Sequence, residues 1–292
     1  MHGESAPRSF FLKTDKNMLD TITAGLGLSC PVLLLDNGSR FTAAMLALPG
    51  TDASLWPKTG LSSESPVEEA RNFLKRSGLP EPGLTVISGM RAGASETDRA
   101  ERCLARMRRW KDFLSETEGR AEHFLQPAMP GWEVEPLRER AETMFGSAFG
   151  TDAGMAAVLT ALSMEPLRER SWREGVTVVW AGHRHLQAFM LYQERLLGLY
   201  EQHNSLSREA FLKDLEEMRL NWLPDEQVRA QGGHGCICGD FPAEAEGFRP
   251  TWILGPRREE LKGCGRLASP SGDDGFDRLV GLLYGLSLRK SS

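Results

Sequence analysis

The chain has 292 residues, of which 26% are charged and 40% hydrophobic, an ordinary balance for a soluble globular protein. Its formal net charge of −5 gives no electrostatic reason to expect nucleic acid or an acidic membrane surface as a partner. The longest apolar stretch, residues 22–35, contains glycine and proline and is too short to span a membrane. We therefore expect one large or two ordinary domains; the sequence leaves the oligomeric state open.

Five cysteines are an odd number and lack the spacing of a disulfide framework, so we expect reduced thiols in a cytoplasmic protein. Cys236 and Cys238 are separated by a single residue and do not form a CxxC motif. The chain also lacks the closely spaced three-cysteine motif that holds an iron–sulfur cluster in radical enzymes.

The first predicted element is a hairpin. Residues 32–36 are predicted to form an apolar strand, Asn37-Gly38-Ser39 a tight turn, and residues 41–48 the returning strand. A capping box with proline at the first helical position then predicts a helix over 66–77, and residues 84–88 a further strand.

Residues 97–116 are predicted to form a long amphipathic helix with one apolar stripe. Its other face carries the basic residues Arg99, Arg102, Arg106, Arg109 and Lys111. A basic groove for an anion is one interpretation of this face. Because acidic residues are interspersed along it, we expect it to be solvated.

Two more helices are predicted over 136–145 and 152–164. The second is rich in small residues, and Ala156 and Ala157 would allow another helix to approach closely. We therefore expect it to form a contact between two domains.

A three-strand meander is predicted over 176–180, 186–192 and 196–200, with a first turn at Ala181-Gly182. Its strand–glycine–strand pattern repeats that of the first hairpin, which suggests two similar subdomains that face each other. After it we expect a helix over 207–220, a glycine loop at Gly232-Gly233-His234-Gly235, a strand over 251–254, a helix from Arg257 and a closing helix over 276–286.

This order of elements resembles the acetate/sugar kinase, Hsp70 and actin superfamily. The resemblance implies an α/β fold of two RNase H-like subdomains facing a central cleft. Residues 1–165 would carry one phosphate hairpin at 32–48, and residues 166–292 the other at 176–191, with the closing helix packing back on the first subdomain. More closely, segments such as Asp152-Ala153-Gly154, Gly182-His183-Arg184-His185 and Gly255-Pro256-Arg257-Arg258 resemble an uncharacterised family labelled "putative pyruvate formate-lyase activating enzyme".

The superfamily resemblance implies an ATPase or phosphotransferase with a small-molecule ligand between the two glycine hairpins. This ligand would be a nucleotide, such as ATP with Mg²⁺, or a phosphorylated small molecule. Asp36 and Asp152 would then be catalytic, although Asp36 could equally cap its own turn. The residues implied in cofactor binding are Gly38, Ser39, Gly182, Gly232, Gly233, Gly255 and Arg257.

The second hairpin departs from the superfamily pattern because Trp180 stands where an aspartate is usual. This leaves no obvious general base for kinase chemistry. The alternative function is therefore a non-hydrolysing member, or a metal-dependent enzyme that uses histidines.

Histidines supply the candidate metal ligands. His183 and His185 would lie on one side of a strand, and i,i+2 pairs suit a metal. Alternatively His185 joins His203 and His234 in a site for zinc, manganese or iron with an open position. The third interpretation is that these are loop histidines that are hydrogen-bonded to the backbone.

Overall fold

The computed structural model describes residues 30–37, 42–47, 54–55, 66–89, 99–183, 185–203, 207–272 and 276–291. Two separate mixed β-sheets organise these residues. The first sheet has the order β3-β2-β1-β4-β5. Its strands are β1 (Val32–Asn37), β2 (Thr42–Ala47), β3 (Ser54–Leu55), β4 (Leu84–Gly89) and β5 (Ala148–Asp152).

The second sheet has the order β11-β10-β6-β7-β8-β9. Its strands are β6 (Val176–Ala181), β7 (His185–Tyr192), β8 (Arg195–His203), β9 (Gly235–Cys238), β10 (Thr251–Leu254) and β11 (Arg266–Leu267). The predicted meander is thus confirmed as β6, β7 and β8.

The two sheets share one topology. In each, the first strand is antiparallel to the second and parallel to the fourth, and the second is antiparallel to the third. If the extra edge strand β9 is set aside, both sheets have the order 3-2-1-4-5. This is the RNase H-like arrangement, so the predicted fold of two such units is confirmed. The division of the chain at residue 165 stays a prediction.

Helices of various lengths connect and cover the sheets. They are α2 (Pro66–Ser77), α3 (Arg99–Thr117), α4 (Glu135–Phe145), α5 (Ala153–Leu162), α6 (Glu165–Arg173), α7 (Arg208–Arg219), α8 (Asp225–Ala230) and α9 (Asp277–Ser291). Short 3₁₀ turns are η2 (Ala121–His123), η3 (Ala243–Phe248) and η4 (Arg258–Leu261). None of the described helices is long and apolar enough to cross a membrane.

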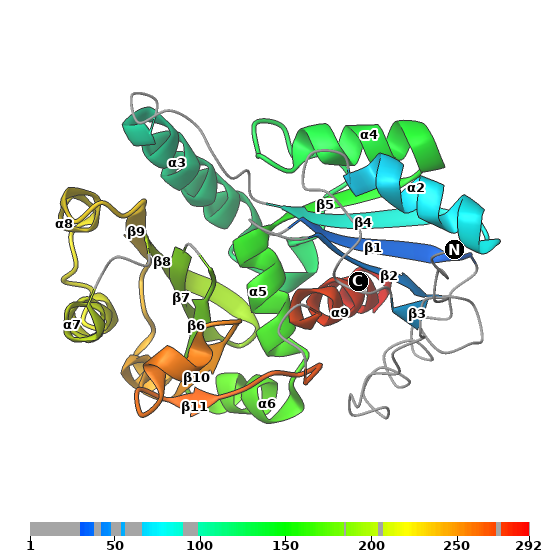
Figure 1. Ribbon diagram of the computed structural model, residues 1–292. Coiled ribbons are helices and arrows are strands. Elements are labelled where there is room, and N and C mark those ends of the chain that lie inside the picture. Colours follow the sequence, from blue (N-terminus) through cyan, green and yellow to red (C-terminus); the bar gives the residue numbers. More distant parts are fainter. Residues whose placement is uncertain are drawn as a thin grey trace, which may run out of the picture.

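The small-residue helix α5 is the centre of the core, and every one of its residues is buried. It lies beside α9 between the two sheets (Figure 1), and α9 also packs against β1 and β4 of the first sheet. One face of the second sheet joins this central core, and its other face packs with α7 and α8. The close helix approach predicted from the alanines of α5 is therefore present.

Gly281 of α9 marks the tightest point of this helix pair. A Cβ atom at this position would lie 2.5 Å from Thr160 Oγ1 and 2.6 Å from the carbonyl oxygen of Ala156. A backbone atom cannot move aside cheaply, so only glycine fits the crossing.

We expect Gly281→Ala to reduce the free energy of unfolding by about 1–3 kcal/mol, because overpacking outweighs the better helix propensity of alanine. Denaturant unfolding measures this change. Gly78→Asn is the control, because Gly78 ends α2 with positive φ and has open space around it. A Gly281→Ala protein as stable as the wild type would contradict the close crossing.

Candidate functional site

The inward face of the second sheet changes from apolar to polar along β7 and β8. Phe189 and Leu199 face each other in register and are buried in the core. Two residues further along, Gln187 faces Glu201, and at the ends of the strands His185 faces His203. Because directly opposed side chains share a face, these four polar residues lie together on the side that looks toward the first sheet.

His234 reaches the same place from the edge strand β9. Its backbone N–H donates to the carbonyl oxygen of Glu201 at 2.9 Å, and the next residue, Gly235, is the register partner of Glu201. The sequence predicts only a flexible glycine loop here. The short strand that fixes His234 was missed because four residues (Gly-Cys-Ile-Cys) carry too little alternation to indicate a strand.

The three imidazoles form a compact cluster. Their ring centroids are 4.9 Å apart for His185 and His203, 5.0 Å for His185 and His234, and 4.9 Å for His203 and His234. One nitrogen from each ring lies within 4.8 Å of the other two. Tetrahedral coordination with bonds of ~2.05 Å places ligand nitrogens roughly 3.3 Å apart, so small side-chain movements would complete a metal site.

Glu201 lies beside this cluster and contacts His234. Its side chain is fully buried, and its Oε1 atom lies 3.1 Å from His234 Nδ1. Metal-binding histidines commonly donate one ring N–H to a carboxylate, which leaves the other nitrogen for the metal. Glu201 is placed to play this part for His234.

Arg106 of α3 holds the other oxygen of Glu201. Its Nε donates to Glu201 Oε2 at 2.7 Å, and its two Nη atoms donate to Asp152 at 2.8 and 3.0 Å. Arg106 is only 3% exposed, so the prediction of a solvated basic face was wrong for this residue. The helix turns Arg106 toward the second sheet, where two buried carboxylates neutralise it.

Asp152, one of the two predicted catalytic residues, is occupied by structural contacts. Besides binding Arg106, its Oδ1 accepts the backbone N–H of Gly154 at 2.7 Å and so caps α5. It is 1% exposed. The described contacts of Asp152 are therefore with Arg106 and the start of α5, and it is not one of the candidate metal ligands.

Charges set the protonation of the cluster. Burial disfavours the imidazolium of His234, but the attraction of Glu201 and the proximity of Cys103 prevail and raise its pKa to about 9. Burial lowers the pKa of His185 to about 3, and repulsion from His234 and His203 adds to this. Burial would raise the pKa of Glu201, but Arg106 and His234 hold it well below its usual range.

Asp36, the other predicted catalytic residue, lies in a different polar contact. Arg278 of α9 binds Asp36 Oδ2 through Nη2 at 2.8 Å, and the Ser88 hydroxyl donates to Oδ1. The Arg278 guanidinium also lies over the ring of Trp180, 5.2 Å from its centroid. The predicted cofactor residues Gly38 and Ser39, in the turn after Asp36, lie outside the described residues.

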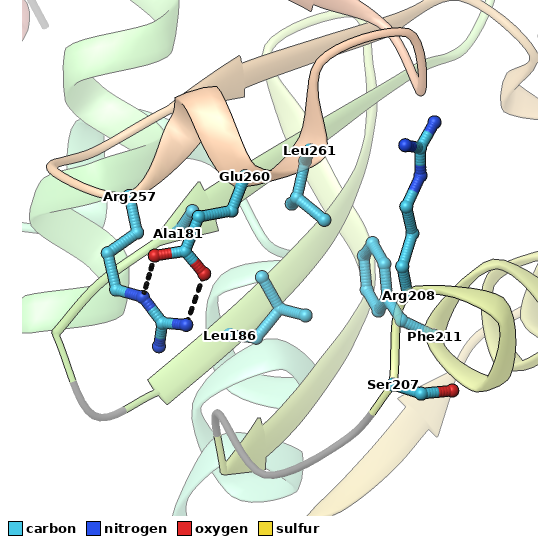
Figure 2. Close-up of a pocket in the computed structure, with 8 residues that line it drawn as sticks. All are labelled: Ala181, Leu186, Ser207, Arg208, Phe211, Arg257, Glu260 and Leu261. Atoms are coloured by element: carbon cyan, nitrogen blue, oxygen red, sulfur yellow. Dashed lines mark hydrogen bonds and ion pairs between the residues drawn. The ribbon is translucent and has the colours of Figure 1, made fainter.

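Gly182, Gly255 and Arg257 come together at the β6–β7 turn. The backbone N–H of Arg257 donates to the carbonyl oxygen of Ala181 at 3.0 Å, and a Cβ atom on Gly255 would lie 2.7 Å from that oxygen. A pocket opens beside this contact (Figure 2), with Ala181, Leu186, Phe211 and Leu261 as apolar lining and Ser207, Arg208, Arg257 and Glu260 as polar lining. The Arg257 guanidinium is already paired with Glu260, with Nε 2.6 Å from Oε1.

Gly232 and Gly233, also predicted to bind a cofactor, lie instead beside the histidine cluster. A Cβ atom on Gly233 would lie 2.7 Å from both Gln202 Oε1 and Val228 Cγ1. The absence of a side chain therefore lets this turn pack tightly and bring His234 to the end of β8.

The chain matches the model of a protein family. A family model described as "Putative pyruvate format-lyase activating enzyme (DUF1786)" matches residues 62–260. A search of the curated proteins finds no match.

Several solved structures are similar over most of the chain. A Bacteroides thetaiotaomicron protein "with actin-like ATPase fold and unknown function" has 9% identity and a TM-score of 0.42, with 89% of this chain and 97% of that one covered. A Listeria monocytogenes protein described as "a putative N-acetylmannosamine kinase" has 10% identity, a TM-score of 0.46 and coverages of 90% and 100%. The Clostridium difficile activator of 2-hydroxyisocaproyl-CoA dehydratase with bound ADPNP has 11% identity, a TM-score of 0.41 and coverages of 89% and 96%. At these scores the fold is assigned from the strand order and directions described above.

The two shifted histidines predict opposite effects of pH on the chelator-treated protein. His234 has a raised pKa, so its stabilisation is fully present below about pH 6.5 and is lost as the pH rises to about 9. The lowered pKa of His185 gives a contribution that is present above about pH 6.5 and is lost as the pH falls to about 3.

We expect His234→Gln to flatten the alkaline decline of the free energy of unfolding, and His185→Gln to flatten the acid decline. Denaturant unfolding across this pH range measures both. His123→Gln, at an exposed position, is the control. Identical profiles for the wild type and both variants would contradict the shifts.

Proposed function

The chain belongs to the family described as "Putative pyruvate format-lyase activating enzyme (DUF1786)", and we propose that its working centre is a divalent transition-metal site built by three histidines. The observation that carries this proposal is the convergence of His185, His203 and His234, whose donor nitrogens lie within 4.8 Å of one another. Imidazole ligands suit zinc, iron, copper and nickel, and three of them leave a position open.

The surroundings of the triad support a metal centre. His234 has the carboxylate partner that metal-binding histidines commonly have, and that partner is itself held by Arg106. The low pKa of His185 keeps its imidazole neutral, which is the form that binds metal. All three side chains remain partly exposed, so an ion and a small-molecule substrate can reach them.

An ion held in this way supplies a Lewis acid and activates water when it is bound. The protein residues divide the remaining work. The imidazoles bind the ion, Glu201 orients His234, and Arg106 keeps Glu201 ionised by pairing its second oxygen. We therefore propose metal-dependent chemistry on a small molecule, in the cytoplasm, where the five free thiols would stay reduced.

The family description implies radical chemistry on an iron–sulfur cluster, and the cysteines do not fit one. Cys236 and Cys238 lie on β9, whereas Cys103 lies on α3. Among the described residues, the histidine triad is the sole group of three or more potential ligands that comes within metal-binding distance. We derive no step through such a cluster.

Protein purified without chelator should carry about one zinc, manganese or iron ion per chain, because three converging imidazoles form a strong site once the ion displaces the proton of His234. His185→Ala should lose the ion, because only two imidazole ligands remain and they bind it too weakly. Elemental analysis by mass spectrometry measures both. His123→Ala, at an exposed histidine outside the triad, should keep the wild-type content. A wild-type protein that takes up none of these ions after dialysis would refute the site.

A second candidate function, nucleotide binding, is favoured by the pocket beside the β6–β7 turn. Its apolar lining would receive a planar ring, and Arg257 would meet an anionic group by exchanging it for its present partner Glu260, in a fold of two RNase H-like units. Asp36 already has Arg278 as its counter-charge, which disfavours a Mg²⁺ site there and favours binding without hydrolysis.

We expect Mg-ATP or Mg-ADP to raise the melting temperature, because a ligand at 100 times its Kd adds about 2.7 kcal/mol to the stability. Arg257→Ala should reduce this shift, whereas Arg249→Ala, at a largely exposed arginine, should not. Differential scanning fluorimetry measures the shift. No shift with any purine nucleotide at millimolar concentration would exclude this candidate.

A further inference from the structure

We propose that Arg106 and Asp152 are positioning residues of the metal centre, which hold Glu201, and through it His234, in the orientation that receives the ion. This inference rests on the proposed metal site and extends it. Both residues come from the part of the chain that builds the first sheet, whereas Glu201 and His234 belong to the second sheet. The metal affinity would thus depend on how α3 and the end of β5 dock against the second sheet.

The contacts form one continuous line. Asp152 receives two hydrogen bonds from the Arg106 guanidinium, Arg106 Nε donates to Glu201 Oε2, and Glu201 Oε1 lies 3.1 Å from His234 Nδ1. The side chains of Arg106, Asp152 and Glu201 are 4%, 1% and 0% exposed. Water therefore has little access to replace any of these contacts.

The two oxygens of Glu201 face different side chains. Oε2 faces Arg106 and Oε1 faces His234, so the guanidinium determines the rotation of the carboxylate about its last bond. Without Arg106, Oε2 loses its hydrogen-bond donor. A buried carboxylate oxygen without a donor is costly, so the carboxylate would turn toward another donor within reach. His234 Nδ1 would then lose the carboxylate oxygen that lies 3.1 Å from it.

α3 brings Arg106 to this position by packing directly on the strand that follows His234. The helix contacts β9, and a Cβ atom on Gly235 would lie 2.9 Å from Met107 Cγ. Figure 1 shows α3 leaning over toward β9 and away from the helices that cover the first sheet. Asp152 is equally fixed, because it also caps α5. The line of contacts therefore starts from two elements that are fixed by packing and capping, α3 and the start of α5.

Cobalt(II) titration of the full-length protein, followed by its visible absorption spectrum, tests the proposal. Arg106→Met should weaken binding roughly 10–100-fold, as expected when the support of a ligand is removed, and should alter the spectrum. Arg106→Lys, which keeps the charge and one donor, should recover part of the affinity. Asp152→Asn should give a smaller loss, because one acceptor for the guanidinium remains.

The matched control is Arg138→Met. Arg138 is also a buried arginine between two carboxylates, Glu135 and Glu142, but all three lie on α4. Its loss should reduce stability while leaving cobalt affinity within about twofold of the wild type.

A double-mutant cycle decides whether Arg106 acts through Glu201. In a Glu201→Gln background, Arg106→Met should change the cobalt affinity by no more than about twofold. The same loss in both backgrounds, or a wild-type affinity for Arg106→Met, would overturn the positioning role while leaving the metal site standing. A wild-type protein that binds no cobalt would overturn the metal site and this inference together.

Discussion

The buried guanidinium of Arg106 is the contact on which the candidate site depends. A charge that is removed from water is tolerated only where opposite charges and hydrogen bonds replace the solvent. Arginine suits this position because its rigid fork of donors can serve one carboxylate with two bonds and another with one. Arg106 uses this geometry to join Asp152 of the first sheet to Glu201 of the second. Loss of one partner from such a buried group typically costs about 3–5 kcal/mol.

Elements that are dictated by neighbours in the sequence could be predicted. Glycine turns between apolar runs indicated both hairpins, and the repeat of this pattern indicated two related sheets. In a meander the first turn and the end of the third strand lie at the same edge, which favoured a meeting of His185 with His203, and the register of β7 with β8 now pairs them directly. These features follow from local chain geometry, which one sequence is enough to show.

Contacts between distant segments could not be predicted in the same way. Arg106 is separated from Glu201 by 95 residues and from Asp152 by 46, and no periodicity links such positions. Arg106 also lies among other arginines on α3, so that its burial is hidden in an apparently polar face. Glu201 lies one residue past the predicted strand over 196–200, whereas the structure extends β8 to His203 and buries Glu201 completely. A fully buried charge requires a partner, and Arg106 is that partner.

The position of α9 has a consequence for how the protein is made. This helix packs against α5 and the central strands of the first sheet, yet the ribosome synthesises it after every strand of both sheets. A nascent chain that has completed the first sheet therefore exposes an apolar face for as long as the second sheet is being translated. High contact order of this kind slows folding and leaves intermediates open to aggregation. The first sheet is therefore expected to gain its full stability only after α9 has been synthesised and has packed against it.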